Sequence, residues 1–330
     1  VIMGKDTYLV TGSSGFIGYN LCNYIIKRGH NVFGLDLDEK YNNLKKWRNE
    51  KLNKIGVKTF CVDISDKYQL DDFKNKNNAS FKSIFHLAGL AGVRRSLEIP
   101  EKYYDANLRG TLNILNLASH INVDSLVFSS TSSVYGGNKN SSKETDNLNP
   151  ISPYANSKLL AEKICKLYSI SNNLNVSILR YFTVYGEAGR PDMSILRFID
   201  NIFNWNPITI YGDGNQERDF TYIEDVCDAT FKSSRLVDFN ILNIGNSKPV
   251  KLNDIVNIIE KKLNKKAKII NEPKNNLDVF KTHADNSRAM NLLKWVPVFN
   301  IEKGIESTVD WYINNHNLIG KLSWGQNLLI

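Results

Sequence analysis

The sequence has few residues of the kinds that build metal sites and disulfide frameworks. Four cysteines and five histidines occur in 330 residues, and no CxxC, HExxH or similar ligand spacing is found among them. We therefore expect neither a bound metal nor a disulfide framework. We expect buried thiols at all four cysteines, which are Cys22, Cys61, Cys165 and Cys227.

Long apolar runs are also missing. No stretch of about 18 or more apolar residues occurs, so we expect no membrane-spanning helix. Residues 1–6 show no basic segment leading into an apolar stretch, as a secretory leader would. These features predict a cytoplasmic protein, and the 42% of hydrophobic residues is enough for a sizeable core.

The charge balance is basic, with 42 Lys and Arg against 34 Asp and Glu and a net charge of +8. The lysines are scattered among asparagines, as in residues 261–266, and no aromatic interleaving or nucleic-acid motif accompanies them. This pattern is typical of a solvated helix face, so no nucleic-acid partner is expected. A positive field still favours an anionic small-molecule substrate.

Short apolar runs alternate with helix-like stretches through the first half of the chain. The runs lie at residues 8–10, 32–35, 60–62, 84–87, 126–128 and 176–179. This alternation predicts an α/β fold, a Rossmann-type doubly wound parallel sheet covered by helices on both faces. Between the first two runs, apolar spacing of three and four residues predicts a helix with Gly29 at its C-terminal cap.

The alternation of apolar runs and helices becomes irregular after about residue 180. Helical stretches there lie near 193–203, 252–263 and 301–314. We expect two domains: a Rossmann domain over residues 1–180, with a return strand near 241–247, and a smaller α/β substrate lobe over 181–330. No repeat or low-complexity linker separates them. The two should therefore pack together around a cleft at the carboxyl ends of the strands.

A glycine-rich segment, TGSSGFIG, follows the first strand and opens the first helix, with Gly12, Gly15 and Gly18 at its key positions. Glycines permit a tight turn and close approach to a pyrophosphate, which the helix N-terminus attracts. Asp36 ends the second strand, near the position of an acid that hydrogen-bonds the adenosine ribose. No arginine follows it to accept a 2′-phosphate, so NAD is expected rather than NADP. Asp63, after the third strand, is a candidate for contacting the adenine.

The residues for chemistry lie in two later segments. Thr131 is part of SSTSSVYG after the fifth strand, and Tyr154 and Lys158 belong to YANSK at the start of a helix. A four-residue interval places Tyr154 and Lys158 on one helical face, where the ammonium favours the phenolate. Because free tyrosine titrates at about 10, this charge helps the phenol to act as a general base near neutral pH.

Together these segments resemble the extended short-chain dehydrogenase/reductases, and within them the nucleotide-sugar epimerases, from the first strand to about residue 312. Further segments that carry the resemblance are HLAGLAGVRRS at 86–96, NLRGTLNIL at 107–115 and RDFTYIEDV at 218–226. RYFTVYGEAGRPDM, at 180–193, is more similar to UDP-glucuronate 4-epimerases than to UDP-galactose 4-epimerases. The latter usually have Asn-Pro where Thr183 and Val184 stand here.

The resemblance implies NAD-dependent 4-epimerisation of a UDP-sugar, UDP-glucuronate to UDP-galacturonate, by transient C4 oxidation, rotation of the 4-keto sugar and re-reduction. Tyr154 would take the proton of the 4-hydroxyl, Thr131 would position the reacting oxygen, and Lys158 would also hold the nicotinamide ribose. The expected cofactor contacts are Gly12, Gly15, Phe16, Ile17, Gly18, Asp36, Asp63, Ile64, Leu87, Ala88, Asn107, Tyr154 and Lys158.

The resemblance also implies a set of substrate contacts. Ser132 and Ser133 stand where 4,6-dehydratases typically carry Asp-Glu. A carboxylate there would repel the carboxylate of a uronate, whereas the hydroxyls of these serines and of Thr183 can donate hydrogen bonds to it. Alternatively, the two serines only satisfy backbone groups at a strand end. Arginine forks suit phosphate and carboxylate. We expect the diphosphate at Arg218 and the sugar or adjacent phosphate at Arg190, and the further candidates are Arg94, Asp278 and Arg288.

Departures from the subfamily pattern leave the identity of the sugar open. Glu187 and Ala188 replace a frequent Pro-Trp, Arg95 replaces an aromatic residue, and Leu277 replaces a glycine. A UDP-glucose or UDP-N-acetylglucosamine 4-epimerase is therefore the alternative within the family. A non-catalytic NAD-binding regulatory protein is the alternative from another class. The resemblance further implies a homodimer formed through residues 107–121 and 153–170.

Overall fold

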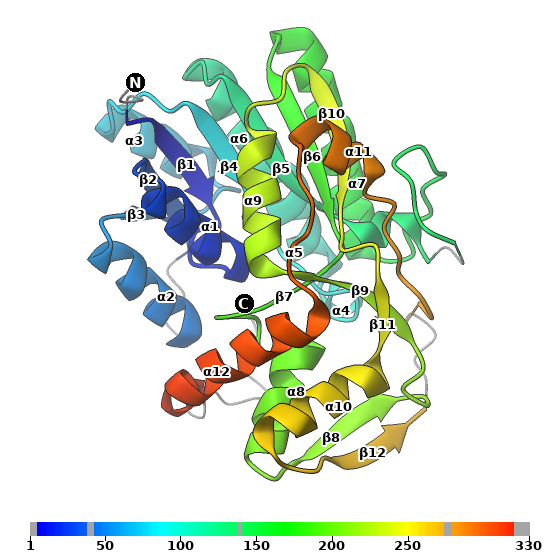
Figure 1. Ribbon diagram of the computed structural model, residues 1–330. Helices are drawn as coiled ribbons and strands as arrows, with labels where there is room; N and C mark the ends of the chain where they lie inside the picture. The colour runs from blue at the N-terminus through cyan, green and yellow to red at the C-terminus, as the bar shows by residue number, and fades with distance from the viewer. Residues whose placement is uncertain (1–4, 38–42, 138–139, 274–278, 320–330) are drawn as a thin grey trace.

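A seven-stranded parallel sheet forms the larger lobe, which lies at the top of Figure 1. The computed structural model describes residues 5–37, 43–137, 140–273 and 279–319. The strands are ordered β10-β6-β5-β4-β1-β2-β3, and each neighbouring pair is parallel. Their bounds are β1 Thr7–Thr11, β2 Asn31–Asp36, β3 Lys58–Cys61, β4 Ser83–His86, β5 Ser125–Thr131, β6 Asn175–Tyr181 and β10 Phe239–Ile244.

Both faces of this sheet are buried, which explains why its strands appear in the sequence as continuous apolar runs. Leu9 and Val10 of β1 point to opposite faces, and each belongs to a different hydrophobic cluster. Ile84 and Phe85 of β4 divide in the same way. The predicted α/β class and the six predicted strands are therefore confirmed.

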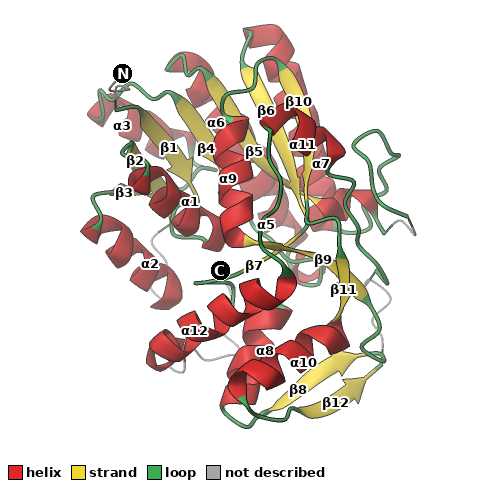
Figure 2. Ribbon diagram, in the orientation of Figure 1, coloured by secondary structure: helices red, strands yellow, loops and turns green. Residues whose placement is uncertain are grey.

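Helices cover the two faces (Figure 2). One cluster joins the sheet to α1 (Phe16–Lys27) and α9 (Ile223–Ser233). The other joins it to α3 (Lys67–Lys76), α6 (Gly110–His120) and α7 (Pro153–Asn172). The remaining helical segments of this lobe are α2 Asn43–Lys54, α4 Arg95–Glu98, α5 Pro100–Tyr104, a π-helical turn Asp105–Arg109, a 3₁₀ turn Ser132–Tyr135 and α11 Ser287–Leu293.

The smaller lobe, at the bottom of Figure 1, contains two small sheets and three helices among the residues described. One sheet has the order β11-β9-β7 and lies at the junction of the lobes, and the other pairs β12 with β8. The bounds are β7 Thr183–Tyr185, α8 Ser194–Phe203, β8 Pro207–Tyr211, β9 Glu217–Tyr222, β11 Pro249–Lys251, α10 Leu252–Leu263, β12 Lys268–Glu272 and α12 Ile301–Ile319. The α1/α9 cluster continues into this lobe, so the two lobes share one core.

The larger lobe also contains elements from beyond residue 180. The chain returns to the larger lobe as α9 and β10, and β10 pairs with β6 at Phe239–Ile244, where the sequence predicts a return strand.

Cys61 is exposed, whereas Cys22, Cys165 and Cys227 are buried. The expectation of a buried thiol at Cys61 is wrong because this residue ends the edge strand β3. No helix in the described part of the chain is long and apolar enough to cross a membrane.

Candidate active site

The glycine loop between β1 and α1 has no room for side chains. A Cβ on Gly12, where φ is +71°, would lie 2.7 Å from the backbone nitrogen of Ala88. A Cβ on Gly18 would lie 2.0 Å from the carbonyl oxygen of Gly12. Gly15 caps α1 without any side-chain hydrogen bond, which leaves the N-terminal amides of that helix for an anion. The loop therefore has the shape and polarity that a pyrophosphate requires.

Other predicted cofactor residues lie at or just beyond the ends of strands β2, β4 and β3. Asp36, at the end of β2, accepts a 2.7 Å hydrogen bond from the amide of Ser14. Leu87 and Ala88, after β4, donate their amides to the carbonyl and hydroxyl oxygens of Thr11. Asp63 lies beyond β3, where its carboxylate accepts hydrogen bonds from the amide and hydroxyl of Ser65.

Thr131 and Tyr154 meet at the carboxyl edge of the sheet. Thr131 is the last residue of β5, and its hydroxyl oxygen accepts a 3.1 Å hydrogen bond from the amide of Ser133. Tyr154 lies in the first turn of α7, which begins at Pro153 after an N-cap at Ser152. Burial raises the pKa of Tyr154, while a hydrogen bond from Thr131 and the positive charge of Arg190 lower it. The phenol therefore needs further positive charge to act as a base near neutral pH.

Lys158 lies one turn along α7 and is 4% exposed. Its ammonium group lies 4.4 Å from the centre of the Phe128 ring, and burial lowers its pKa to about 8. Asn107, in the π-helical turn, anchors this region through hydrogen bonds to both backbone groups of Leu90 and to the hydroxyl of Ser157. The π-helical turn was not predicted, and such turns often occur at functional sites.

Arg190 reaches the same place from the smaller lobe. It forms a two-point ion pair with Asp192, with N···O distances of 3.0 and 2.6 Å. Its charge acts on Tyr154 and on Tyr103, whose rings are 6.1 Å apart. Arg190 is therefore a source of positive charge toward Tyr154 that the sequence did not predict, in addition to the expected role of Lys158.

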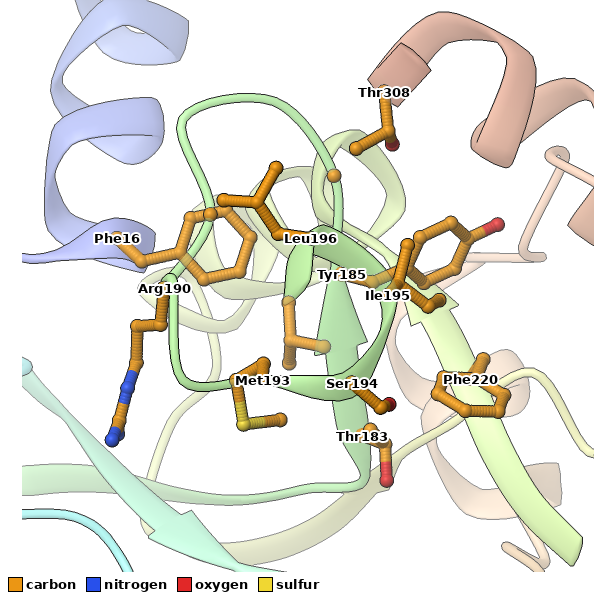
Figure 3. A pocket seen from close by; sticks show the side chains of 13 residues that line it. Phe16, Thr183, Tyr185, Arg190, Met193, Ser194, Ile195, Leu196, Phe220 and Thr308 are labelled. Atoms are coloured by element: carbon orange, nitrogen blue, oxygen red, sulfur yellow. The ribbon is translucent and has the colours of Figure 1, made fainter. Parts of the chain in front are cut away.

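A small pocket lined by Arg190 lies beside this centre. Figure 3 shows Arg190 and Thr183 on opposite sides of it, with Phe16 contributed by α1 and Thr308 by α12. Two predicted substrate residues and one predicted cofactor residue thus line one cavity. The remaining lining residues are Val184, Tyr185, Gly186, Gly189, Met193, Ser194, Ile195, Leu196 and Phe220.

Other predicted substrate residues are more dispersed. The Arg94 guanidinium lies 4.3 Å from the centre of the Tyr211 ring in the smaller lobe. Arg218, on β9, donates to the carbonyl oxygens of Glu217 and Phe280. Arg288 contacts Asn240 near the start of β10, so the structure does not bring it to the carboxyl edge where Thr131 lies. Asp278 lies outside the described residues.

A buried ion pair behind the site was not predicted. Glu162, on α7, accepts two hydrogen bonds from Arg180 of β6 at 2.7 and 3.0 Å, and the two side chains are 4% and 2% exposed. Ser130, next to Thr131, donates to the same carboxylate at 2.5 Å. Tyr154, Lys158 and Glu162 follow one another at four-residue intervals, and this spacing was the available signal.

The fold and this site define an enzyme class, the dinucleotide-dependent enzymes of Rossmann type that use a buried tyrosine. Within it, the chain belongs to the NAD dependent epimerase/dehydratase family, whose model matches residues 8–245. The chain is 43% identical over 317 residues to a UDP-glucuronate 4-epimerase of Thermodesulfobacterium geofontis (strain OPF15), and the match covers 94% of this chain and 98% of that relative.

Solved structures agree with this membership. A UDP-glucuronic acid 4-epimerase from Bacillus cereus, in complex with UDP-glucuronic acid and NAD, has a TM-score of 0.85 and 32% identity, covering 93% of this chain and 99% of its own. A UDP-glucose 4-epimerase from Thermotoga maritima, with UDP-glucose, has a TM-score of 0.87 and 26% identity, covering 94% and 99%. The fold alone therefore does not separate the two sugars.

Proposed function

We propose that this protein is an NAD-dependent UDP-sugar 4-epimerase that interconverts UDP-glucuronate and UDP-galacturonate. The observation that carries this proposal is the hydrogen-bonded pair of Thr131 and Tyr154 beside the cationic Arg190. The residues after Thr131 are Ser132 and Ser133, so no carboxylate stands at these two positions. The similarity to UDP-glucuronate 4-epimerases supports the same assignment.

The cofactor would lie along the glycine loop. Gly12, Gly15 and Gly18 would admit the pyrophosphate, Asp36 would accept hydrogen bonds from the adenosine ribose, and Asn107 would hold the loop around residue 89 beside Lys158. When bound, NAD supplies the acceptor and donor of the C4 hydride, and its positive ring favours the phenolate of Tyr154. Phe16, Ile17, Asp63, Ile64, Leu87 and Ala88 complete the proposed contacts.

The reaction needs a proton acceptor, an orienting group and a positive charge. Tyr154 removes the proton of the sugar 4-hydroxyl and later returns it, and Thr131 fixes the reacting oxygen by hydrogen bonding. Lys158 would hold the nicotinamide ribose and, with Arg190, adds positive charge near the phenol. Its pKa of about 8 keeps the ammonium mostly charged at neutral pH.

Recognition of the sugar is assigned to hydroxyl and guanidinium groups. Thr183 and Arg190 line the pocket, and Ser132 and Ser133 lie in the 3₁₀ turn that follows Thr131. Hydroxyls donate hydrogen bonds to a uronate carboxylate, and a guanidinium binds it at two points. We assign the diphosphate to Arg218, with Arg94 and Asp278 as further candidates. The two-domain division, the homodimer and the cytoplasmic location stay predictions.

The test is turnover of UDP-glucuronate by the purified protein, followed through the sugar H4 coupling by NMR. Tyr154→Phe removes only the phenol oxygen, so we expect the rate to fall about 10²- to 10⁴-fold with NAD binding retained. Tyr103→Phe is the matched control, since it removes a hydroxyl from the neighbouring ring, where that group donates to the carbonyl of Ala91. It should retain most of the rate.

Three outcomes would contradict the proposal in different ways. Conversion of UDP-glucose or UDP-N-acetylglucosamine, with none of UDP-glucuronate, would keep the chemistry and change the sugar. Equal rates for the wild type and Tyr154→Phe would remove the proposed base. A protein that binds NAD and converts no UDP-sugar would be a non-catalytic binder.

A further inference from the structure

A buried arginine outside the proposed catalytic set connects the cofactor loop to the substrate side of the site. Arg48, on α2, is 3% exposed. Its guanidinium donates to the carbonyl oxygens of Ser14 at 3.2 Å, Ala188 at 2.6 Å and Gly189 at 2.9 Å. Ser14 belongs to the glycine loop, whereas Ala188 and Gly189 immediately precede Arg190. One side chain therefore joins two loops that are far apart in the sequence.

The second loop, residues 186–192, is held in a conformation that needs outside support. Ala188 has φ of +52°, which a residue with a Cβ adopts only at an energetic cost. Asn20 of α1 donates to the backbone oxygen of Glu187 at 3.2 Å, and the hydroxyl of Tyr222 donates to the Glu187 carboxylate. Groups from α1 and α2 thus hold the backbone of this loop, and a group from β9 holds the side chain of Glu187.

The second loop contains a residue that acts on the catalytic tyrosine. Arg190 lines the pocket and acts on the pKa of Tyr154. The path from the glycine loop to the catalytic phenol consists of Ser14, Arg48, Ala188 with Gly189, and Arg190. Each step is a hydrogen bond, a covalent neighbour or a charge interaction.

We propose that Arg48 is a positioning residue that couples binding of the dinucleotide at the glycine loop to binding of the sugar end of the substrate at residues 186–192. The proposal rests on the proposed function, and it adds a link between its two ligands. A dinucleotide that orders the loop around Ser14 fixes one acceptor of Arg48 and so restrains the arginine. Because Arg48 also binds Ala188 and Gly189, these residues are then already partly ordered, and sugar binding costs less conformational entropy. Such a difference in ordering entropy makes two ligands bind cooperatively without a large movement.

The planar fork of arginine is essential to this role. It donates from two nitrogens to acceptors on two loops, whereas lysine presents a single ammonium group. Arg48→Lys keeps the buried positive charge and loses the fork, and Arg48→Met removes both. Lys46→Met is the matched control, because it removes one positive charge from the exposed face of the same helix.

The experiment measures dissociation constants for UDP-glucuronate by calorimetry, with and without saturating NAD, in the Tyr154→Phe background so that turnover is strongly slowed. In the parent and in Lys46→Met we expect NAD to tighten UDP-glucuronate about 10-fold, within the usual range of coupling between two sites. In Arg48→Lys and Arg48→Met this ratio should fall below about 3-fold. UDP without the sugar should show a smaller ratio in the parent, and Arg48 substitutions should leave that ratio unchanged.

A merely structural role gives a different result. If both Arg48 variants lower the melting temperature and keep the parent ratio, the proposal is overturned, because a lost structural contact alone does not change the ratio of two affinities. Arg48→Lys supplies the measurement if Arg48→Met does not fold. If the parent binds UDP-glucose but not UDP-glucuronate, the proposed sugar has failed, and the coupling ratio is then measured with UDP-glucose.

Discussion

Replacing Glu162 by glutamine should strongly lower the free energy of unfolding while leaving the folded structure nearly unchanged. The substitution keeps the volume of the side chain and removes its charge, so the guanidinium of Arg180 stays buried without its carboxylate. Arg180 retains a 3.0 Å hydrogen bond to the hydroxyl of Tyr135 and a 3.4 Å hydrogen bond to the carbonyl of Glu144. Neither partner carries the compensating negative charge.

The magnitude follows from the distance and the burial. At 2.7 Å, and with an effective dielectric constant of about 20, two unit charges attract by about 6 kcal/mol. Removing one partner of a buried pair typically destabilises a protein by about 3–5 kcal/mol. The free energy of unfolding of a folded protein is about 5–15 kcal/mol. Glu162→Gln should therefore remove a large share of it.

The assay is urea unfolding of the wild type, Glu162→Gln, Arg180→Met and the double variant, followed by tryptophan fluorescence. Each single substitution should lower the free energy of unfolding by about 3–5 kcal/mol. The double variant should lose less than the sum, because it buries no unpaired charge. Strict additivity of the two losses would refute the reasoning, since it would mean that the two side chains do not act as a pair.

Two other substitutions test the cofactor loop and the catalytic lysine. Gly18→Ala should abolish NAD binding measured by fluorescence titration, because the added Cβ would lie 2.0 Å from the carbonyl oxygen of Gly12. Gly29→Ala is the control. Nothing lies within 4 Å of its added Cβ, so it should affect NAD binding much less. Burial lowers the pKa of Lys158 to about 8 from 10.5 in the unfolded chain, so the unfolded state binds more protons between these values and stability rises with pH there. Relative to Lys158→Met, the wild type should gain about 3 kcal/mol of unfolding free energy across that window, and parallel pH profiles of the two proteins would contradict the shift.

The sequence was sufficient for the larger lobe because its strands are buried on both faces, so that pairs such as Leu9 and Val10 are both apolar. The glycine loop and the interval from Tyr154 to Lys158 were likewise visible, since both depend on local spacing. Arg48 was missed because its partners are carbonyl oxygens, which every residue possesses. The approach of Arg190 to Tyr154 joins two lobes, and local spacing carries no information about such a contact.

The return of α9 and β10 to the larger sheet has a consequence for the order in which the protein folds during synthesis. The last strand of that sheet, Phe239–Ile244, leaves the ribosome after most of the chain, and α9 emerges only shortly before it. Until then β6 has an open edge, and the sheet face that carries Phe85 and Val127 lacks the packing of Phe231. A fragment ending at residue 180 would keep both exposed surfaces and would tend to aggregate. The larger sheet therefore cannot be completed until about residue 244 has been made. Until then, the nascent chain depends on protection from self-association.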